Sequence, residues 1–282
     1  DPTCDDQEKN GQETDIDCGG PDTDCARCEI GQSCAIGDDC ASGICAAGVC
    51  AECDPDSADF GLGDGTEDDP YRVCSPQHLQ NISDAPEAHF KLVGHIDFDG
   101  FDEQFPPIGS NDEPFVGTLD GGGLEIRNFK IDNASTDLLG LFAVIGEEGS
   151  VKDLTFTDAE IKGKDYVGVL AGKNFGHIDD VHIFGKVHGE TFLGGIAGHH
   201  ETGAIQNSSA NIDASGIEAI GALVGMNKDG IIETSRTAGS VTGEYRLGGL
   251  IGQSQAGKIR ESSSKVEIAA ESAHRVGGLV GE

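Results

Sequence analysis

The sequence predicts an all-β protein whose larger part is a right-handed β-solenoid of 27-residue coils with a short capping helix, preceded by a small disulfide-rich domain. Two observations support this prediction: a motif that recurs along the second half of the chain, and ten cysteines, nine of which lie between Cys4 and Cys53. We place a cysteine-rich module at 1–53, a linker, cap and first coils at 54–134, and the solenoid repeats at 135–282.

The repeat is anchored by glycines that recur every 27 residues, and a β-branched residue follows two positions after each. The glycines are Gly149, Gly176, Gly203, Gly230 and Gly257, and the residues that follow are Val151, Ile178, Ile205, Ile232 and Ile259. Such a unit is too short for a core of its own, but stacked at about 4.8 Å it pairs its backbone with the next unit. We expect about six coils, buried β-branched ladders, and glycines that supply positive φ at the corners.

A second motif, apolar-Gly-x-apolar-apolar-Gly, occurs five times, at Val167–Gly172, Leu193–Gly198, Ile220–Gly225, Leu247–Gly252 and Val276–Gly281. Alternation points Leu250 and Ile251 in opposite directions, so we expect one of them to face another layer or the solvent. Serine recurs in the later coils, where the earlier ones have Leu154 and Val181, at Ser208, Ser235 and Ser262. This replacement indicates an inward ladder of hydroxyl groups or a narrower core.

These repeats resemble the GLUG-motif repeats of bacterial surface proteins, including filamentous-haemagglutinin-like adhesins. The resemblance covers roughly residues 115–282, and Gly65–Tyr71 resembles the segment that precedes such repeats. It implies a β-solenoid in an exported protein with a structural or adhesive role. It transfers no catalytic residue to this chain.

The segment before the repeats carries the signals of a linker and a cap. A polar, proline-containing connector, Asp54–Asp59, indicates the domain boundary. Ser75 and Pro76 are suited to the N-cap and the first position of a short helix that we expect to end near Asp84. The alternating segments 90–97 and 115–126 predict strands.

The charge balance excludes several classes of partner. The formal net charge is −33 and the sequence pI about 4.3, so the basic patches that nucleic acids require are missing, and anionic membranes are disfavoured. An acidic surface is compatible with divalent cations. No apolar run approaches the length of a membrane span, and we expect that any signal peptide has been removed before Asp1.

The cysteines place the chain in an oxidising compartment, because an even number at this density predicts a disulfide framework. We therefore predict a secreted protein located outside the cell or on its surface. The cysteine loops resemble small modules of bacterial surface proteins, and their pairing is left open. The alternative is zinc at the CxxC of Cys25 and Cys28, although no nearby histidine completes a four-ligand site.

An acidic stretch in this module has the spacing of a calcium loop. Oxygen ligands at the required positions would come from Asp6, Glu8, Asn10, Gln12 and Asp17. Gly11 occupies the sixth position, where the loop turns sharply, and Gln12 would contribute its backbone carbonyl. The alternative is a solvated acidic loop, bracketed by Cys4 and Cys18 and closed by a disulfide.

We find no sequence evidence for an active site. The acidic pair Asp179 and Asp180 aligns with Gln206 and Asn207 one coil later, as expected of an ordinary polar face. The histidines that could approach one another do not recur at the repeat spacing; they are His182, His188, His199 and His200. We therefore predict an extracellular structural or adhesive protein that is not an enzyme. The alternative is a carbohydrate-binding or polysaccharide-acting β-helix, although the tyrosines (Tyr71, Tyr166 and Tyr245) are scattered.

The last repeat suggests self-association. Glu282 follows directly after Val276–Gly281, so a monomer ending there would present an unfinished coil. Natural proteins usually cover such strand edges. We expect either further chain or the N-terminal region of a neighbouring copy to pack there, and head-to-tail contacts that do not close would build a filament.

Overall fold

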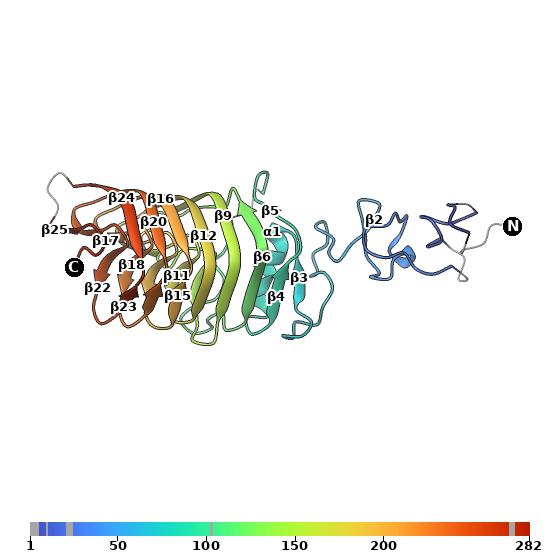
Figure 1. Ribbon diagram of the computed structural model, residues 1–282, viewed down its shortest axis with the longest axis horizontal. Coiled ribbons are helices and arrows are strands. Elements are labelled where there is room, and N and C mark those ends of the chain that lie inside the picture. The colour runs from blue at the N-terminus through green and yellow to red at the C-terminus, as the bar shows by residue number, and fades with distance from the viewer. Residues whose placement is uncertain (1–5, 10, 21–24, 102–103, 271–273) are drawn as a thin grey trace.

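The computed structural model describes the chain except residues 1–5, 10, 21–24, 102–103 and 271–273. Figure 1 shows parallel coils stacked along the long axis, with the cysteine-rich segment extending beyond α1 (Pro76–Asn81) and the C-terminus at the opposite end. The described residues form one α-helix and two short 3-10 helices, η1 (Gly37–Asp39) and η2 (Ile82–Asp84). The predicted all-β solenoid, short helix and disulfide-rich region are confirmed.

Three parallel sheets form the sides of the solenoid. The longest runs through β3 (Tyr71–Val73), β4 (His89–Leu92), β6 (Thr118–Arg127), β9 (Ser150–Lys162), β12 (His177–His188), β15 (Ala204–Gln206), β19 (Ile231–Glu233) and β23 (Lys258–Arg260). It continues sideways into β5 (Ile96–Asp97), β7 (Lys130–Asp132), β16 (Ser209–Ser215), β20 (Arg236–Thr242) and β24 (Ser263–Ala269). The successive pairings along the main path amount to about seven turns, one more than predicted.

The other two sheets have five strands each. One contains β8 (Phe142–Ile145), β11 (Ala171–Asn174), β14 (Ala197–His200), β18 (Val224–Asn227) and β22 (Ile251–Ser254). The other contains β10 (Asp165–Val167), β13 (Thr191–Leu193), β17 (Glu218–Gly221), β21 (Tyr245–Gly248) and β25 (His274–Gly277). The cysteine-rich segment adds an antiparallel pair, β1 (Cys45–Ala46) and β2 (Val49–Cys50).

The predicted β-branched ladder is confirmed. Its five members pair directly from coil to coil, and the first four are at most 1% exposed; they are Val151, Ile178, Ile205, Ile232 and Ile259. Leu250 and Ile251 are both fully buried, so neither faces the solvent. The chain bends between β21 and β22 at this point, so strand alternation does not continue through it and both side chains enter the core.

The corner glycines serve close packing rather than positive φ. Of the five, only Gly203 has positive φ, at 74°. A Cβ on Gly176 would lie 2.1 Å from the carbonyl oxygen of Gly149, and one on Gly230 would meet the His200 ring. The left-handed conformation instead falls on residues with side chains, at Asp153, Asp180, Asn207, Thr234 and Glu261.

The serine column forms the inward hydroxyl ladder. Ser208 Oγ accepts a hydrogen bond from the backbone N–H of Val181 at 3.1 Å, and Ser262 Oγ accepts from Ser235 at 3.1 Å. The hydroxyls of Ser208 and Ser235 also donate to backbone carbonyls two residues earlier. Both serines are at most 1% exposed, so the hydroxyl groups link neighbouring coils inside the stack.

The cap and the cysteine-rich segment are joined covalently. Ser75 Oγ accepts from the His78 backbone N–H at 3.2 Å, which confirms the expected N-cap of α1. Disulfides among the described residues join Cys18 to Cys28, Cys34 to Cys45, Cys40 to Cys50 and Cys53 to Cys74. Cys25 is also disulfide-bonded, so the zinc alternative at the CxxC is wrong. The bond between Cys53 and Cys74 ties the cysteine-rich segment to the cap.

Candidate binding face of the solenoid

One column of residues along the solenoid has an unusual backbone conformation. The residue before each apolar-Gly motif has positive φ, between 54° and 66°, and these residues are Tyr166, Phe192, Ala219, Arg246 and Arg275. The glycine that ends the motif one coil later packs on this backbone, since a Cβ on Gly198 would lie 2.4 Å from the carbonyl carbon of Tyr166. The column changes from aromatic to basic along the stack.

The aromatic part of this column packs around a histidine. The rings of Tyr166 and Phe192 stack with centroids 5.0 Å apart, and His199 lies 5.8 Å and 6.0 Å from them with nearly parallel planes. The Lys173 ammonium lies 5.0 Å from the Tyr166 ring centroid. His199 is 8% exposed, and neither ring nitrogen has a hydrogen-bond partner among the described residues. Burial lowers the pKa of His199, while Glu201 raises it in part.

The four histidines considered from the sequence do not form one site. His182 and His188 contact serine hydroxyls of the next coil, at 2.9 Å from Ser209 and 2.7 Å from Ser215. His199 belongs to the aromatic cluster, and His200 points into the core, where it is fully buried. Burial lowers the pKa of His200 to about 4, so its ring is neutral at physiological pH.

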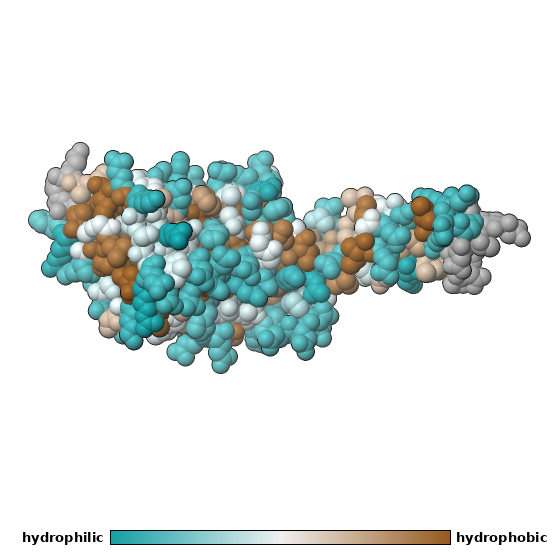
Figure 2. Space-filling model, in the orientation of Figure 1, coloured by the Kyte–Doolittle hydropathy of each residue, from teal (hydrophilic) through white to brown (hydrophobic). Residues whose placement is uncertain are grey.

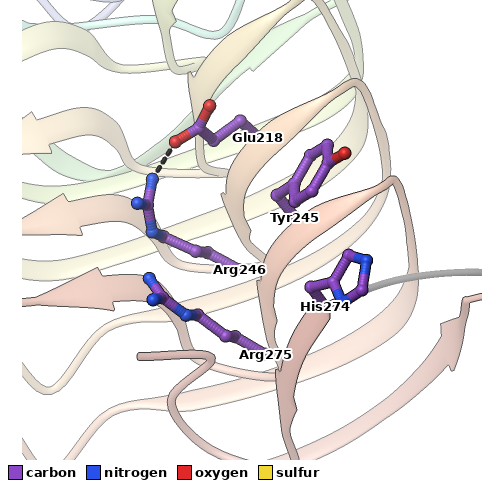
Figure 3. A pocket seen from close by; sticks show the side chains of 5 residues that line it. All are labelled: Glu218, Tyr245, Arg246, His274 and Arg275. Atoms are coloured by element: carbon purple, nitrogen blue, oxygen red, sulfur yellow. Dashed lines mark hydrogen bonds and ion pairs between the residues drawn. The ribbon is translucent and has the colours of Figure 1, made fainter.

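The basic part of the column lines a cleft on the last coils. The cleft has a volume of about 470 Å³ and is lined by Glu218, Tyr245, Arg246, His274 and Arg275. Figure 3 shows the two arginines extending the same way from neighbouring coils, with the two rings on the other side. The rings of Tyr245 and His274 stack at 5.6 Å.

The two arginines converge on one carboxylate. Arg246 and Arg275 both donate to Oε2 of Glu282, and Arg246 also donates to Glu218. The hydrogen bond from Arg246 is the largest cause of the lowered pKa of Glu282. Because guanidinium groups recognise carboxylates through paired hydrogen bonds, this arrangement is chemically suited to an anionic group.

The predicted calcium ligands are only partly described. The Asp17 carboxylate accepts the backbone N–H groups of Asp6 and Gln7 at 3.0 Å, and the Asp6 carboxylate accepts that of Glu8 at 2.9 Å. The structure therefore brings Asp6, Glu8 and Asp17 into one exposed loop. Asn10 lies outside the described residues. Calcium binding stays a prediction.

Gln12, which was expected to contribute its backbone carbonyl to the calcium loop, is exposed to solvent. The alternative, a solvated loop closed by a disulfide between its bracketing cysteines, is wrong in that closure, because Cys18 pairs with Cys28.

Sequence reasoning missed the ring partners of the tyrosines. Tyr166 and Tyr245 are far apart, yet each stacks on a ring of the next coil, from Phe192 and His274. The signal was in the motif itself, whose copies are spaced 26, 27, 27 and 29 residues apart rather than strictly 27. Alignment on the motif, instead of on a constant period, places Phe192 beside Tyr166.

Comparisons with known proteins find relatives over part of the chain. No family model matches. Halomucin of Haloquadratum walsbyi is 37% identical over 147 residues, and a candidate Gly-rich membrane protein of Evansella cellulosilytica is 36% identical over 137 residues. The matches cover 48% and 45% of this chain but only 2% and 16% of those proteins.

A solved structure shares the fold. A candidate immunoglobulin A1 protease from Bacteroides ovatus superposes with a TM-score of 0.65 and 22% identity, covering 77% of this chain and 72% of that one. At this identity the likeness shows the solenoid fold alone. Among the described residues, no helix is both long and apolar enough to cross a membrane.

Proposed function

We propose that this chain is a rigid, non-enzymatic module of an extracellular surface protein, with a structural or adhesive role. The observation that carries the proposal is the uninterrupted stack of parallel strands from β3 to β23 around a single apolar core. About seven turns at ~4.8 Å each make a rod of roughly 34 Å. In such a stack each coil contacts mainly its neighbours, so repetition extends length without changing the cross-section.

The compartment and the relatives support this role. The described cysteines are all in disulfides, which persist in oxidising environments outside the cytosol. The partial relatives are named as a mucin and a membrane protein, and neither name denotes catalysis. The acidic composition favours a soluble, well-hydrated surface.

Surface labelling of intact producing cells tests the location. We expect antibodies against the solenoid to decorate unpermeabilised cells, and protease added outside to remove the signal while a cytosolic marker survives. Detection only after permeabilisation would contradict the proposal. Comparing adhesion to a solid substrate between cells with and without the segment for 135–282 then separates an adhesive from a purely structural role.

We also propose end-to-end association with a second copy, through apolar side chains of the β23–β25 region. Several apolar side chains of this region are only half-buried: Ile259, Val266, Ile268, Leu279 and Val280. Figure 2 shows apolar surface gathered towards this end. Analytical ultracentrifugation of the chain should show concentration-dependent linear oligomers that Val266→Lys abolishes. A monomer at all concentrations would refute the association.

The arginine cleft favours a second candidate function, the binding of acidic saccharides. A uronate carboxylate could take the place of Glu282 between Arg246 and Arg275, with its ring against Tyr245. Calorimetry with oligogalacturonate should show binding that Arg246→Gln abolishes, whereas Arg260→Gln, on another sheet, leaves it unchanged. Because Glu282 competes for the same guanidinium groups, Glu282→Gln should tighten binding. Weaker binding in that variant would exclude this mode.

A further inference from the structure

The chain contains three Asn-x-Ser sequons, at Asn81, Asn133 and Asn207. This tripeptide is the acceptor for N-linked glycans in exported proteins, provided that it lies on an accessible surface. The disulfide framework indicates export, so the three sites can be compared by what their side chains contact in the folded protein.

Two of the sequons are held by the fold. The Asn81 amide nitrogen donates to the Ala58 carbonyl at 2.6 Å, and its oxygen accepts from Gln77 at 2.9 Å. The Asn207 amide nitrogen donates to Asp179 at 2.7 Å. The middle residue of the Asn207 sequon, Ser208, is 1% exposed within the hydroxyl ladder. A glycan at either position would disturb contacts that join separate segments.

Asn133 lies in a different setting, just after β7. Its backbone carbonyl accepts from Thr136 N–H at 3.0 Å, which closes a tight turn, and Ala134 and Ser135 within the turn are exposed. Ser135 Oγ donates to the amide oxygen of Asn133 at 3.1 Å. The amide nitrogen of Asn133 has no hydrogen-bond acceptor among the described residues. The nitrogen that would carry a glycan is therefore the uncommitted atom of this turn.

We propose that Asn133 is an N-glycosylation site. The co-substrate is a lipid-phosphate-linked oligosaccharide, delivered by a membrane-bound transferase. The amide nitrogen forms a bond to the anomeric carbon of the sugar while the bond from that carbon to the phosphate oxygen breaks. The lipid phosphate leaves with the electron pair, and the amide loses one proton to a base of the transferase. No oxidant or reductant is needed.

Mass spectrometry of the full chain purified from its producing cells tests the proposal. The peptide containing Asn133 should carry a hexose- or hexosamine-containing mass increment. Asn133→Gln and Ser135→Ala should both remove it, whereas Ser135→Thr, which keeps the hydroxyl, should retain it. Asn207→Gln serves as the matched control and should leave the modification of Asn133 unchanged.

Three results would overturn the assignment. They are a peptide around Asn133 that is wholly unmodified, a modification that survives Ser135→Ala, and a glycan found on Asn81 or Asn207 in place of Asn133. Circular dichroism of each variant separates loss of the sequon from loss of the fold, since Ser135 and Asn133 lie in a surface turn outside the core.

Discussion

Replacing His200 by asparagine tests how a buried polar column supports the corners of the solenoid. Asn174 and His200 pair across β11 and β14, and Asn227 follows His200 in β18; all three are fully buried. The amides of Asn174 and Asn227 both accept from and donate to the backbone of a nearby corner glycine, at 3.1–3.3 Å. His200 interrupts this pattern, and its Nε2 has no hydrogen-bond partner among the described residues.

The expected change in the free energy of unfolding with pH follows from the pKa of His200. Burial lowers it from 6.5 to about 4, so the unfolded chain binds this proton more readily than the folded one. The stability that the folded chain has while His200 is neutral is present in full above pH 6.5. It is lost as the pH falls towards 4. A difference of about 2.5 units corresponds to about 3 kcal/mol, of which about 2 kcal/mol is lost between pH 7 and pH 4.5.

Urea unfolding at pH 7 and pH 4.5 measures this effect. The wild type should lose about 2 kcal/mol more free energy of unfolding over this interval than His200→Asn, because carboxylates that titrate in both proteins cancel in the comparison. His188→Asn removes a partly exposed histidine and serves as the matched control for the substitution itself. An equal pH dependence in His200→Asn and the wild type would refute the conclusion that His200 is buried and neutral.

Three further predictions concern the core, the disulfides and calcium. Ile205→Ala should cost about 2–5 kcal/mol in chemical unfolding, since the side chain is fully buried, whereas Phe184→Ala, 45% exposed, should cost much less. Reduction should unfold the cysteine-rich module while the β-sheet circular dichroism of the solenoid survives; loss of that signal would show that the Cys53–Cys74 bond supports the stack. Calorimetry should detect calcium binding at ~10⁻⁴–10⁻³ M that Asp6→Ala removes, and no heat at millimolar calcium would leave a solvated loop.

Much of the solenoid could be predicted because repetition in the sequence is repetition in space. Residues 27 apart that must stack on one another share an environment, so the ladder of Ile178, Ile205 and Ile232 could be predicted without coordinates. The same alignment gave an inward hydroxyl ladder as one of two explanations for Ser208, and the structure shows the hydroxyl hydrogen-bonded inside the stack, as a buried polar group must be. The density of cysteines likewise predicted a disulfide-rich module.

Other features depend on geometry that a linear pattern does not contain. Position 230 requires glycine because a Cβ there would meet the His200 ring of the neighbouring coil. The φ of Gly230 itself does not require glycine. The pairing of Cys18 with Cys28 depends on how two loops meet in space. The change of period from 27 to 26 and 29 residues displaces Phe192 and His274 from the positions that a constant repeat predicts for them.

The sequence by itself determined the stacking, since a short repeat can bury its apolar residues only against copies of itself. The tertiary structure alone decided which side chains meet across the bends between sheets. Inside β10 and β21, next to these bends, the backbone leaves the extended conformation at Tyr166 and Arg246, whose positive φ no residue type in the motif announces. Because those bends set the direction of each side chain, the aromatic cluster and the arginine cleft follow from the folded backbone rather than from the motif.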